Sequence, residues 1–142
     1  AYLPLWDDPL TFIVASDHPL ASEGSLTLSE LARYPAILPG LATYTGRIVA
    51  ELFSERQIEI SAPLSTNYLE TISMLVSTGL GWSVLPRSMS DELCVLQTQA
   101  PKIARTLGCI TNPQRTLSSA ASAFIEVLIA TADSTGEEQR NG

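Results

Sequence analysis

Residues 75–86 run LVSTGLGWSVLP and pass from the end of a predicted helix into a predicted strand. Apolar residues at helical spacing indicate the helix, and Gly79 fits the position just after its last turn. The strand is the apolar run 82–85, and Pro86 ends it. A helix that returns directly into a buried strand is typical of an α/β domain.

The same alternation of strand and helix extends along the chain in both directions. Thr27 and Glu30 fit a capping box at the start of a short helix. The clearest helical stripe lies near the end of the chain and consists of Ala121, Phe124, Ile125, Leu128 and Ile129. Strands are predicted at 10–15, 36–38, 58–61, 82–85, 93–96 and 106–111. We therefore expect an α/β fold with a mostly parallel sheet flanked by helices.

Composition excludes several classes of protein. The 142 residues include 8 Lys and Arg against 15 Asp and Glu, which gives a formal net charge of −7, and 45% of the residues are hydrophobic. So much apolar surface argues against a disordered chain, and the acidic balance argues against direct binding of nucleic acid. No apolar run is long enough to predict a membrane span.

The residues offer no catalytic or metal-binding set. His18 is the only histidine, and Cys94 and Cys109 lie far apart in the sequence. A general base needs an orienting partner, and zinc needs four ligands. The glycines of 79–81 precede a strand, whereas those of a dinucleotide-binding loop follow one. We therefore expect no enzyme activity, no metal and no cofactor.

Two hydroxyl-rich loops, at residues 43–46 and 65–67, share one pattern, because each follows a predicted strand and opens a predicted helix. In a parallel sheet both would emerge at the carboxyl edge, where open α/β folds bind ligands. Helix N-termini at that edge favour a small anion, and Arg47 offers a positive charge. The alternative is that these residues only cap their helices, at about 1 kcal/mol each. Gly46, which has no side chain, would let a ligand approach the backbone closely. The candidate binding residues are Thr43, Tyr44, Thr45, Gly46, Thr66 and Asn67.

Several ordered stretches resemble the effector-sensing region of LysR-type transcriptional regulators. They are PLTFIVASDHPLA at 9–21, LTLSEL at 26–31, TYTGR at 43–47, LVSTGLGWSVLP at 75–86 and the segment 105–124. The resemblance implies a fold like that of type 2 periplasmic binding proteins, with an effector cleft between two α/β subdomains. A periplasmic solute-binding protein is the alternative with the same architecture.

The resemblance also implies a layout for the chain. Residues 1–9 would form the hinge or crossover that leads into the second sensing subdomain, which would be residues 10–104. Residues 105–130 would form the returning strand and helix of the first subdomain, and residues 131–142 would be a disordered tail. The six residues named above would form one wall of the effector site, with Trp6 a weaker candidate, and the other wall would lie outside this sequence.

The implied partners are a small effector and a second copy of the chain, which would pair through residues 46–61. DNA would be bound only through an N-terminal domain outside this sequence, and the location would be the cytoplasm.

Overall fold

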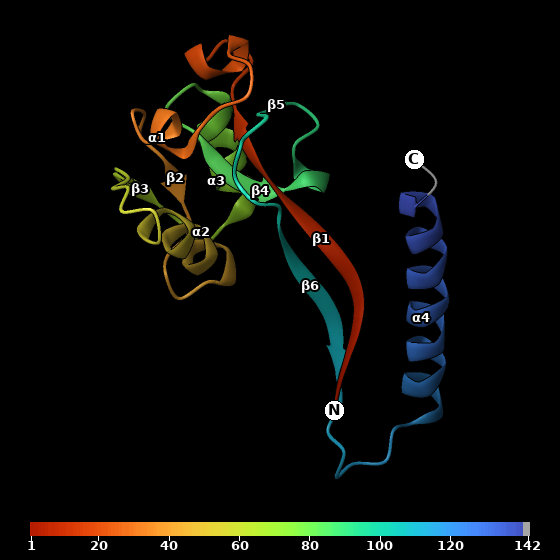
Figure 1. The fold of residues 1–142 in the computed structure, drawn as a ribbon. Coiled ribbons are helices and arrows are strands. Elements are labelled where there is room, and N and C mark those ends of the chain that lie inside the picture. The colour runs from red at the N-terminus through yellow and green to blue at the C-terminus, as the bar shows by residue number, and fades with distance from the viewer. Residues whose placement is uncertain (141–142) are drawn as a thin grey trace. The chain divides into compact units, whose positions relative to one another are not determined.

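A computed structural model describes residues 1–140, with side chains described as far as Asp133 (Figure 1). The chain groups into two units. The larger unit is Pro9–Arg105, and the smaller combines Ala1–Asp8 with the segment that begins at Thr106. The second sensing subdomain was predicted at residues 10–104, which lie within this larger unit.

The sheet of the larger unit begins with two short parallel strands. β2 (Ile37–Leu38) pairs with β3 (Leu64–Ser65), and a parallel bridge between Ala36 and Trp82 leads on towards β4. The predicted strand at 58–61 is wrong, because the strand lies at Leu64–Ser65 instead. Ile58 and Ile60 do alternate, but they do so in an extended loop whose side chains pack against the core.

The rest of the sheet is antiparallel. β4 (Ser83–Pro86) pairs with β1 (Tyr2–Val14), and β1 pairs with β5 (Cys94–Val95), both in antiparallel register. The α/β class is confirmed, but the sheet is mixed and not mostly parallel. The sequence could not reveal this, because a strand buried on both faces has the same apolar pattern in either direction.

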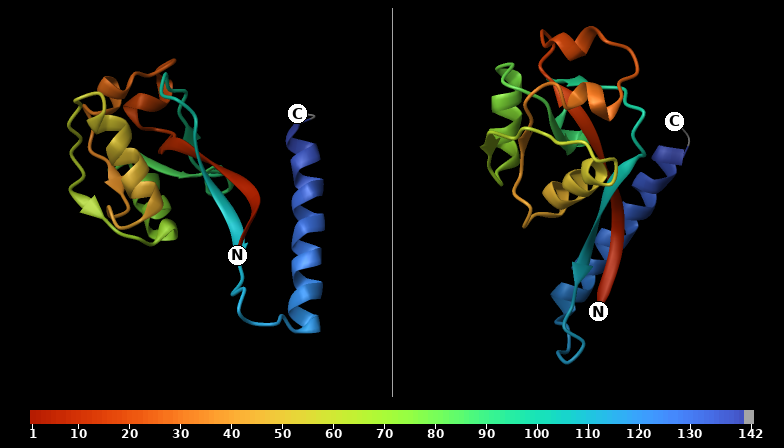
Figure 2. Two further views of the ribbon diagram at one scale, coloured as in Figure 1. Left: turned by 60° about the horizontal axis from the view of Figure 1, so that its bottom comes forward. Right: turned by 60° about the vertical axis from the view of Figure 1, so that its left-hand side comes forward.

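Helices cover both faces of this sheet (Figure 2). Successive residues of β1, β2 and β4 alternate between two apolar clusters, as the period of a strand requires. One cluster packs against α1 (Leu28–Leu31) and α2 (Tyr44–Ser54), and the other packs against α3 (Leu69–Ser77). The predicted capping box at Thr27 and the predicted left-handed Gly79 after α3 are confirmed.

Trp82 lies at the centre of the larger cluster. Its side chain is fully buried, stacks on Phe53 of α2 with ring centroids 5.5 Å apart, and contacts Phe12 of β1 at 5.8 Å. The indole N–H donates to the Tyr34 carbonyl over 3.1 Å, so its polar group is satisfied. Gly81 precedes it because a Cβ there would collide with the Pro35 carbonyl.

Three further elements complete the larger unit and its boundary. Two single-turn 3-10 helices, Pro19–Ser22 and Arg87–Met89, follow β1 and β4. β6 (Ile103–Ile110) begins in the larger unit and ends in the smaller one.

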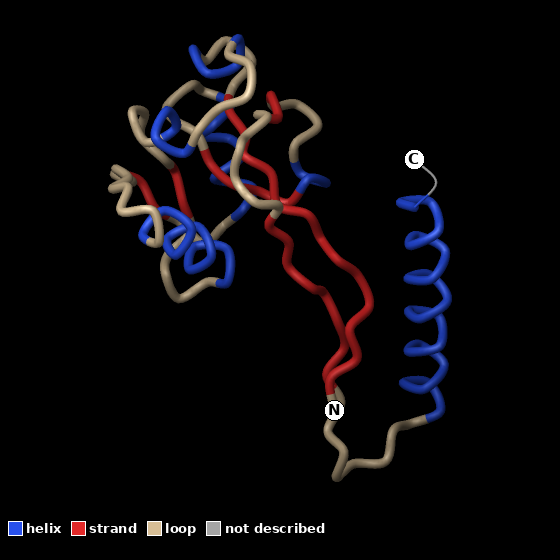
Figure 3. Tube along the Cα trace, viewed as in Figure 1, coloured by secondary structure: helices blue, strands red, loops and turns tan. Residues whose placement is uncertain are grey.

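The smaller unit contains paired strand ends and a long helix. The Thr111 N–H donates to the Ala1 carbonyl over 2.8 Å, and the Thr106 hydroxyl donates to Asp7 over 3.2 Å, so β1 and β6 run in opposite directions. α4 extends from Ser119 to Arg140 without interruption (Figure 3). The predicted disordered tail is therefore wrong for 131–140, and residues 141–142 lie outside the described residues.

The apolar stripe of α4 is largely uncovered. Phe124 is 62% exposed and Val127 61% exposed, and Ile125 and Leu128 are only half-buried. The helical period of this stripe was predicted correctly. No helix in the described part of the chain is long and apolar enough to cross a membrane.

Candidate functional site

The first predicted loop follows β2 and opens α2. Thr43 is the N-cap of α2, and its hydroxyl accepts from the Gly46 N–H over 3.1 Å. The same hydroxyl donates to the Gly40 carbonyl over 2.7 Å, and the Thr43 N–H also reaches that carbonyl over 2.9 Å. Thr43 is thus a capping residue that also fixes the turn at Gly40.

Gly46 has a packing role in this loop and not the role that the sequence predicted. The residue is buried, and a Cβ added there would collide with the carbonyl oxygens of Pro39 and Gly40. We expected its missing side chain to let a ligand approach the backbone. Instead, the space is taken by the preceding turn of this same chain.

Thr45 and Tyr44 differ in exposure. Thr45 is 5% exposed, and its hydroxyl has no hydrogen-bond partner among the described side chains and backbone groups. Tyr44 is 48% exposed, and its phenol donates to the Ala104 carbonyl over 3.3 Å. Tyr44 therefore connects the start of α2 to the start of β6 within the larger unit.

The second predicted loop follows β3 and precedes α3. Its residues do not cap the helix, because the N-cap is Tyr68 and makes no side-chain capping bond. Ser65 donates to the Leu38 carbonyl of β2 over 2.8 Å, and the Thr66 hydroxyl accepts from the Tyr68 N–H over 3.4 Å. Helix capping therefore does not explain these polar side chains.

The two loops meet at one edge of the sheet. The Asn67 carbonyl oxygen accepts from the Gly40 N–H over 3.0 Å, and β2 and β3, which lead into the loops, are parallel neighbours. We call the two turns together, residues 40–46 and 65–67, the two-loop rim. All six residues predicted from the sequence lie on it.

The helix ends at the two-loop rim differ in their local charge. The first turn of α2 has no acidic residue, whereas the first turn of α3 includes Glu70. The partial positive charge at the α2 N-terminus is therefore not balanced by a carboxylate in the first turn of the helix. Arg47, in the next turn of α2, is exposed.

The histidine and the cysteines lie outside the two-loop rim. His18 is buried, its Nδ1 accepts from the Leu20 N–H over 3.1 Å, and its ring edge contacts Tyr34. Burial lowers the pKa of His18, although the nearby charge of Asp17 opposes the shift. The described residues contain no group of three His, Cys, Asp or Glu that could hold a metal ion.

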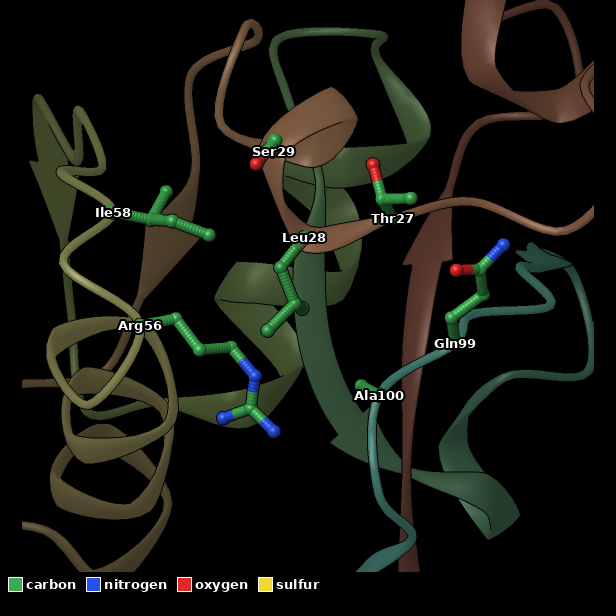
Figure 4. A pocket seen from close by; sticks show the side chains of 7 residues that line it. All are labelled: Thr27, Leu28, Ser29, Arg56, Ile58, Gln99 and Ala100. Atoms are coloured by element: carbon green, nitrogen blue, oxygen red, sulfur yellow. The ribbon is translucent and has the colours of Figure 1, made fainter.

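A pocket that the sequence did not predict lies elsewhere in the larger unit (Figure 4). It has a volume of about 220 Å³ and includes none of the residues of the two-loop rim. No local motif marks it, because its walls come from α1, the turn after α2 and the loop after β5. Its lining residues are Thr27, Leu28, Ser29, Arg56, Ile58, Gln99 and Ala100.

Comparison with known proteins identifies the class of this chain. The family described as the LysR substrate binding domain matches residues 1–133. The chain belongs to this family. Its relatives are transcriptional regulators and not enzymes, which confirms the expected function class and does not favour the periplasmic alternative.

Particular relatives show how much of such a protein the chain represents. It is 30% identical over 132 residues to the HTH-type transcriptional regulator YybE of Bacillus subtilis (strain 168), covering 91% of this chain and 45% of that protein. It is 27% identical to the HTH-type transcriptional activator CmpR of Synechocystis, covering 87% and 43%. The chain thus spans about half the length of these curated relatives.

Solved regulatory domains have the same fold. The CcmR regulatory domain of Synechocystis PCC6803, in complex with 2-PG, matches with a TM-score of 0.79 and 25% identity, covering 93% of this chain and 66% of that one. The effector binding domain of QuiR, in complex with shikimate, matches with a TM-score of 0.80 and 26% identity, covering 94% and 66%. The type 2 periplasmic-binding-protein-like fold is therefore confirmed.

Proposed function

We propose that this chain is the effector-sensing part of a LysR-type transcriptional regulator and that a small anionic effector binds at the two-loop rim. The observation that carries the proposal is the hydrogen bond between the Gly40 N–H and Asn67. It joins two polar loops that are 27 residues apart in the sequence, at the edge where α/β folds hold ligands.

The chemistry of the two-loop rim favours an anion. The N-terminus of α2 directs N–H groups towards the rim and has no acidic residue in its first turn. Thr45 adds a hydroxyl that no described residue satisfies, and Thr66 adds another whose oxygen accepts only a long bond. Shikimate, the ligand of the related QuiR domain, is a carboxylate, which agrees with this preference.

The six residues have different roles in this proposal. Thr45 and Thr66 donate to the effector, and exposed Tyr44 contacts its less polar part. Thr43 and Asn67 position the two loops through their bonds to the Gly40 backbone. Gly46 allows α2 to approach the Gly40 turn and does not touch the effector.

The proposal extends to a second wall of the effector site. The unit Pro9–Arg105 would be the second sensing subdomain, and the remainder would complete the first. The chain covers 66% of the solved regulatory domains, and the apolar stripe of α4 is exposed, so we place the opposing wall in residues outside this chain. Binding would favour one arrangement of the subdomains by its differential affinity for the two.

The regulator would also bind DNA and a second copy of itself, and this acidic chain is not the part that would bind DNA. We assign DNA binding to another part of the regulator, because a net charge of −7 disfavours contact with phosphates and the relatives are HTH-type regulators. Pairing of two copies through residues 46–61, and action in the cytoplasm, complete the proposal.

A thermal-shift screen of small carboxylates on the intact sensing region tests the proposed site. The Thr45→Val variant keeps the shape of the side chain and removes its hydroxyl, so it should weaken binding about tenfold, the value of one bond to a charged partner. Thr78→Val is the matched control, because Thr78 lies at the end of α3 away from the two-loop rim and its hydroxyl donates only to the Leu75 carbonyl. Equal binding by both variants would remove Thr45 from the site.

A further inference from the structure

The pocket beside Arg56 combines one positive charge with apolar walls (Figure 4). Leu28, Ile58 and Ala100 supply the apolar surface, and Arg56 is its only basic lining residue. Figure 4 shows the Arg56 side chain extending from the turn after α2 towards Leu28 and Ala100. All seven lining residues belong to the larger unit.

The turn after α2 holds Arg56 in place. The Ile58 N–H donates to the Phe53 carbonyl over 3.1 Å and the Gln57 N–H donates to Ser54 over 3.0 Å, which is the Schellman pattern of helix ends. The Arg56 Nη1 donates to the Leu52 carbonyl over 3.0 Å. This bond orients the guanidinium group at the pocket.

Most of the donor capacity of Arg56 remains available. A guanidinium group has five N–H donors, and only Nη1 has a partner among the described residues. Within the described part of the chain, the one carboxylate that comes within 4.0 Å of Arg56 is that of Glu55, at 3.9 Å, and both side chains are well exposed. Such a pair contributes little, about 0–1 kcal/mol, so it leaves the charge of Arg56 free to bind an anion.

The polar residues that line the pocket besides Arg56 are of two kinds. Thr27 is committed to Glu30 through the capping box, which also lowers the pKa of the Glu30 carboxyl group. The Ser29 hydroxyl and the Gln99 side-chain amide have no partner among the described residues and can donate to a ligand. A volume of about 220 Å³ equals that of about seven waters, which limits the ligand to a small molecule.

We propose that this pocket binds a small organic carboxylate, separately from the two-loop rim. The carboxylate pairs with the free edge of Arg56, and the hydrocarbon part packs against Leu28, Ile58 and Ala100. The two sites lie at opposite ends of α2, because Thr43 caps its start and Arg56 follows its end. Arg56 and Ile58 also fall within residues 46–61, the segment proposed for pairing. Ligand binding in the pocket would therefore affect the pairing of two copies.

Titration of the chain with butanoate, followed by the backbone amide signals of Ser29 and Gln99, tests this proposal. Butanamide has the same shape without the charge, and inorganic phosphate is an anion without the apolar part. Butanoate should produce saturable shifts, and both other probes should bind at least about fivefold more weakly. Butanamide binding as tightly as butanoate, phosphate binding as tightly, or no saturable shift with butanoate, would overturn the proposal.

Variants assign the binding to Arg56. Arg56→Met keeps the apolar stem and should weaken butanoate binding about fivefold or more, whereas Arg87→Met makes the same charge change at an exposed position outside both proposed sites and should have no effect. Arg56→Lys keeps the charge and serves if Arg56→Met does not fold. It should bind with intermediate affinity. Equal affinity in wild type and in every Arg56 variant that folds would contradict the proposal.

Two controls separate this site from other effects. Light scattering on each variant shows whether a change in pairing accompanies the change in binding. Thr45→Val should leave the Ser29 and Gln99 shifts unchanged, because Thr45 belongs to the two-loop rim. Loss of these shifts in Thr45→Val would show that butanoate binds at the rim and would refute a separate pocket.

Discussion

Replacing Gly46 by alanine sets two opposing effects against each other. Alanine favours a helix over glycine by about 1 kcal/mol, so on propensity alone the variant would be more stable. The added Cβ, however, would collide with the carbonyl oxygens of Pro39 and Gly40. Because both obstacles are backbone atoms, neither can rotate away, and the turn itself must move.

The collision should outweigh the propensity. Overpacking a tight site costs about 1–3 kcal/mol, and contact with two backbone oxygens lies at or above the upper end of that range. We therefore expect Gly46→Ala to lower the free energy of unfolding by about 2 kcal/mol, and the melting temperature by about 10 °C. Displacing Gly40 should also lengthen its bond to Asn67 and weaken effector binding at the two-loop rim.

Urea denaturation and thermal melting measure the effect. Gly24→Ala is the matched control, because nothing lies within 4 Å of a Cβ added there, and its stability should stay within about 0.5 kcal/mol of wild type. A Gly46→Ala variant as stable as Gly24→Ala would refute the proposed packing of α2 against the Gly40 turn.

Three other substitutions test separate features of the larger unit. Burial lowers the pKa of His18 below its ordinary 6.5, so the folded state favours the neutral ring that accepts from Leu20. This contribution to the free energy of unfolding is complete above pH 6.5 and is lost as the pH falls. The His18→Asn variant should therefore show a free energy of unfolding that depends less on pH between about pH 7.5 and about pH 5.5. Gln57 has a φ of 57°, a backbone conformation that favours glycine. Gln57→Gly should therefore raise the free energy of unfolding by about 1 kcal/mol in urea titrations. A lower free energy of unfolding would contradict the left-handed turn after α2. The Ser83 hydroxyl is buried without a partner among the described residues, and Ser83→Ala should therefore stabilise the fold by about 1 kcal/mol in the same assay, whereas destabilisation would indicate a partner such as a bound water.

Local signals in the sequence predicted local structure well. The capping box at Thr27, the left-handed glycine after α3 and the apolar faces of α2 and α3 all depend on residues close together in the chain. The convergence of the two loops was also predictable, because it follows from the parallel pairing of β2 with β3.

Features that depend on distant residues were not predictable. The antiparallel course of β1 is set by its partners β4 and β5, which follow some 70 or more residues later. The true role of Gly46 depends on the position of the Gly40 turn, and the Arg56 pocket depends on three separate segments. The continuation of α4 beyond residue 130 was not predictable from helix propensity, because residues 131–136 include Gly136 and other weak helix formers.

The most direct test of effector binding at the two-loop rim is an NMR titration of the intact sensing region with a panel of small carboxylates, with shikimate as the first probe. Binding at the rim predicts that an effective ligand shifts the backbone amide signals of Tyr44, Thr45 and Thr66, and that Thr45→Val weakens the response about tenfold. Ligand-induced shifts confined to residues outside 40–46 and 65–67, with full affinity retained in Thr45→Val, would contradict it.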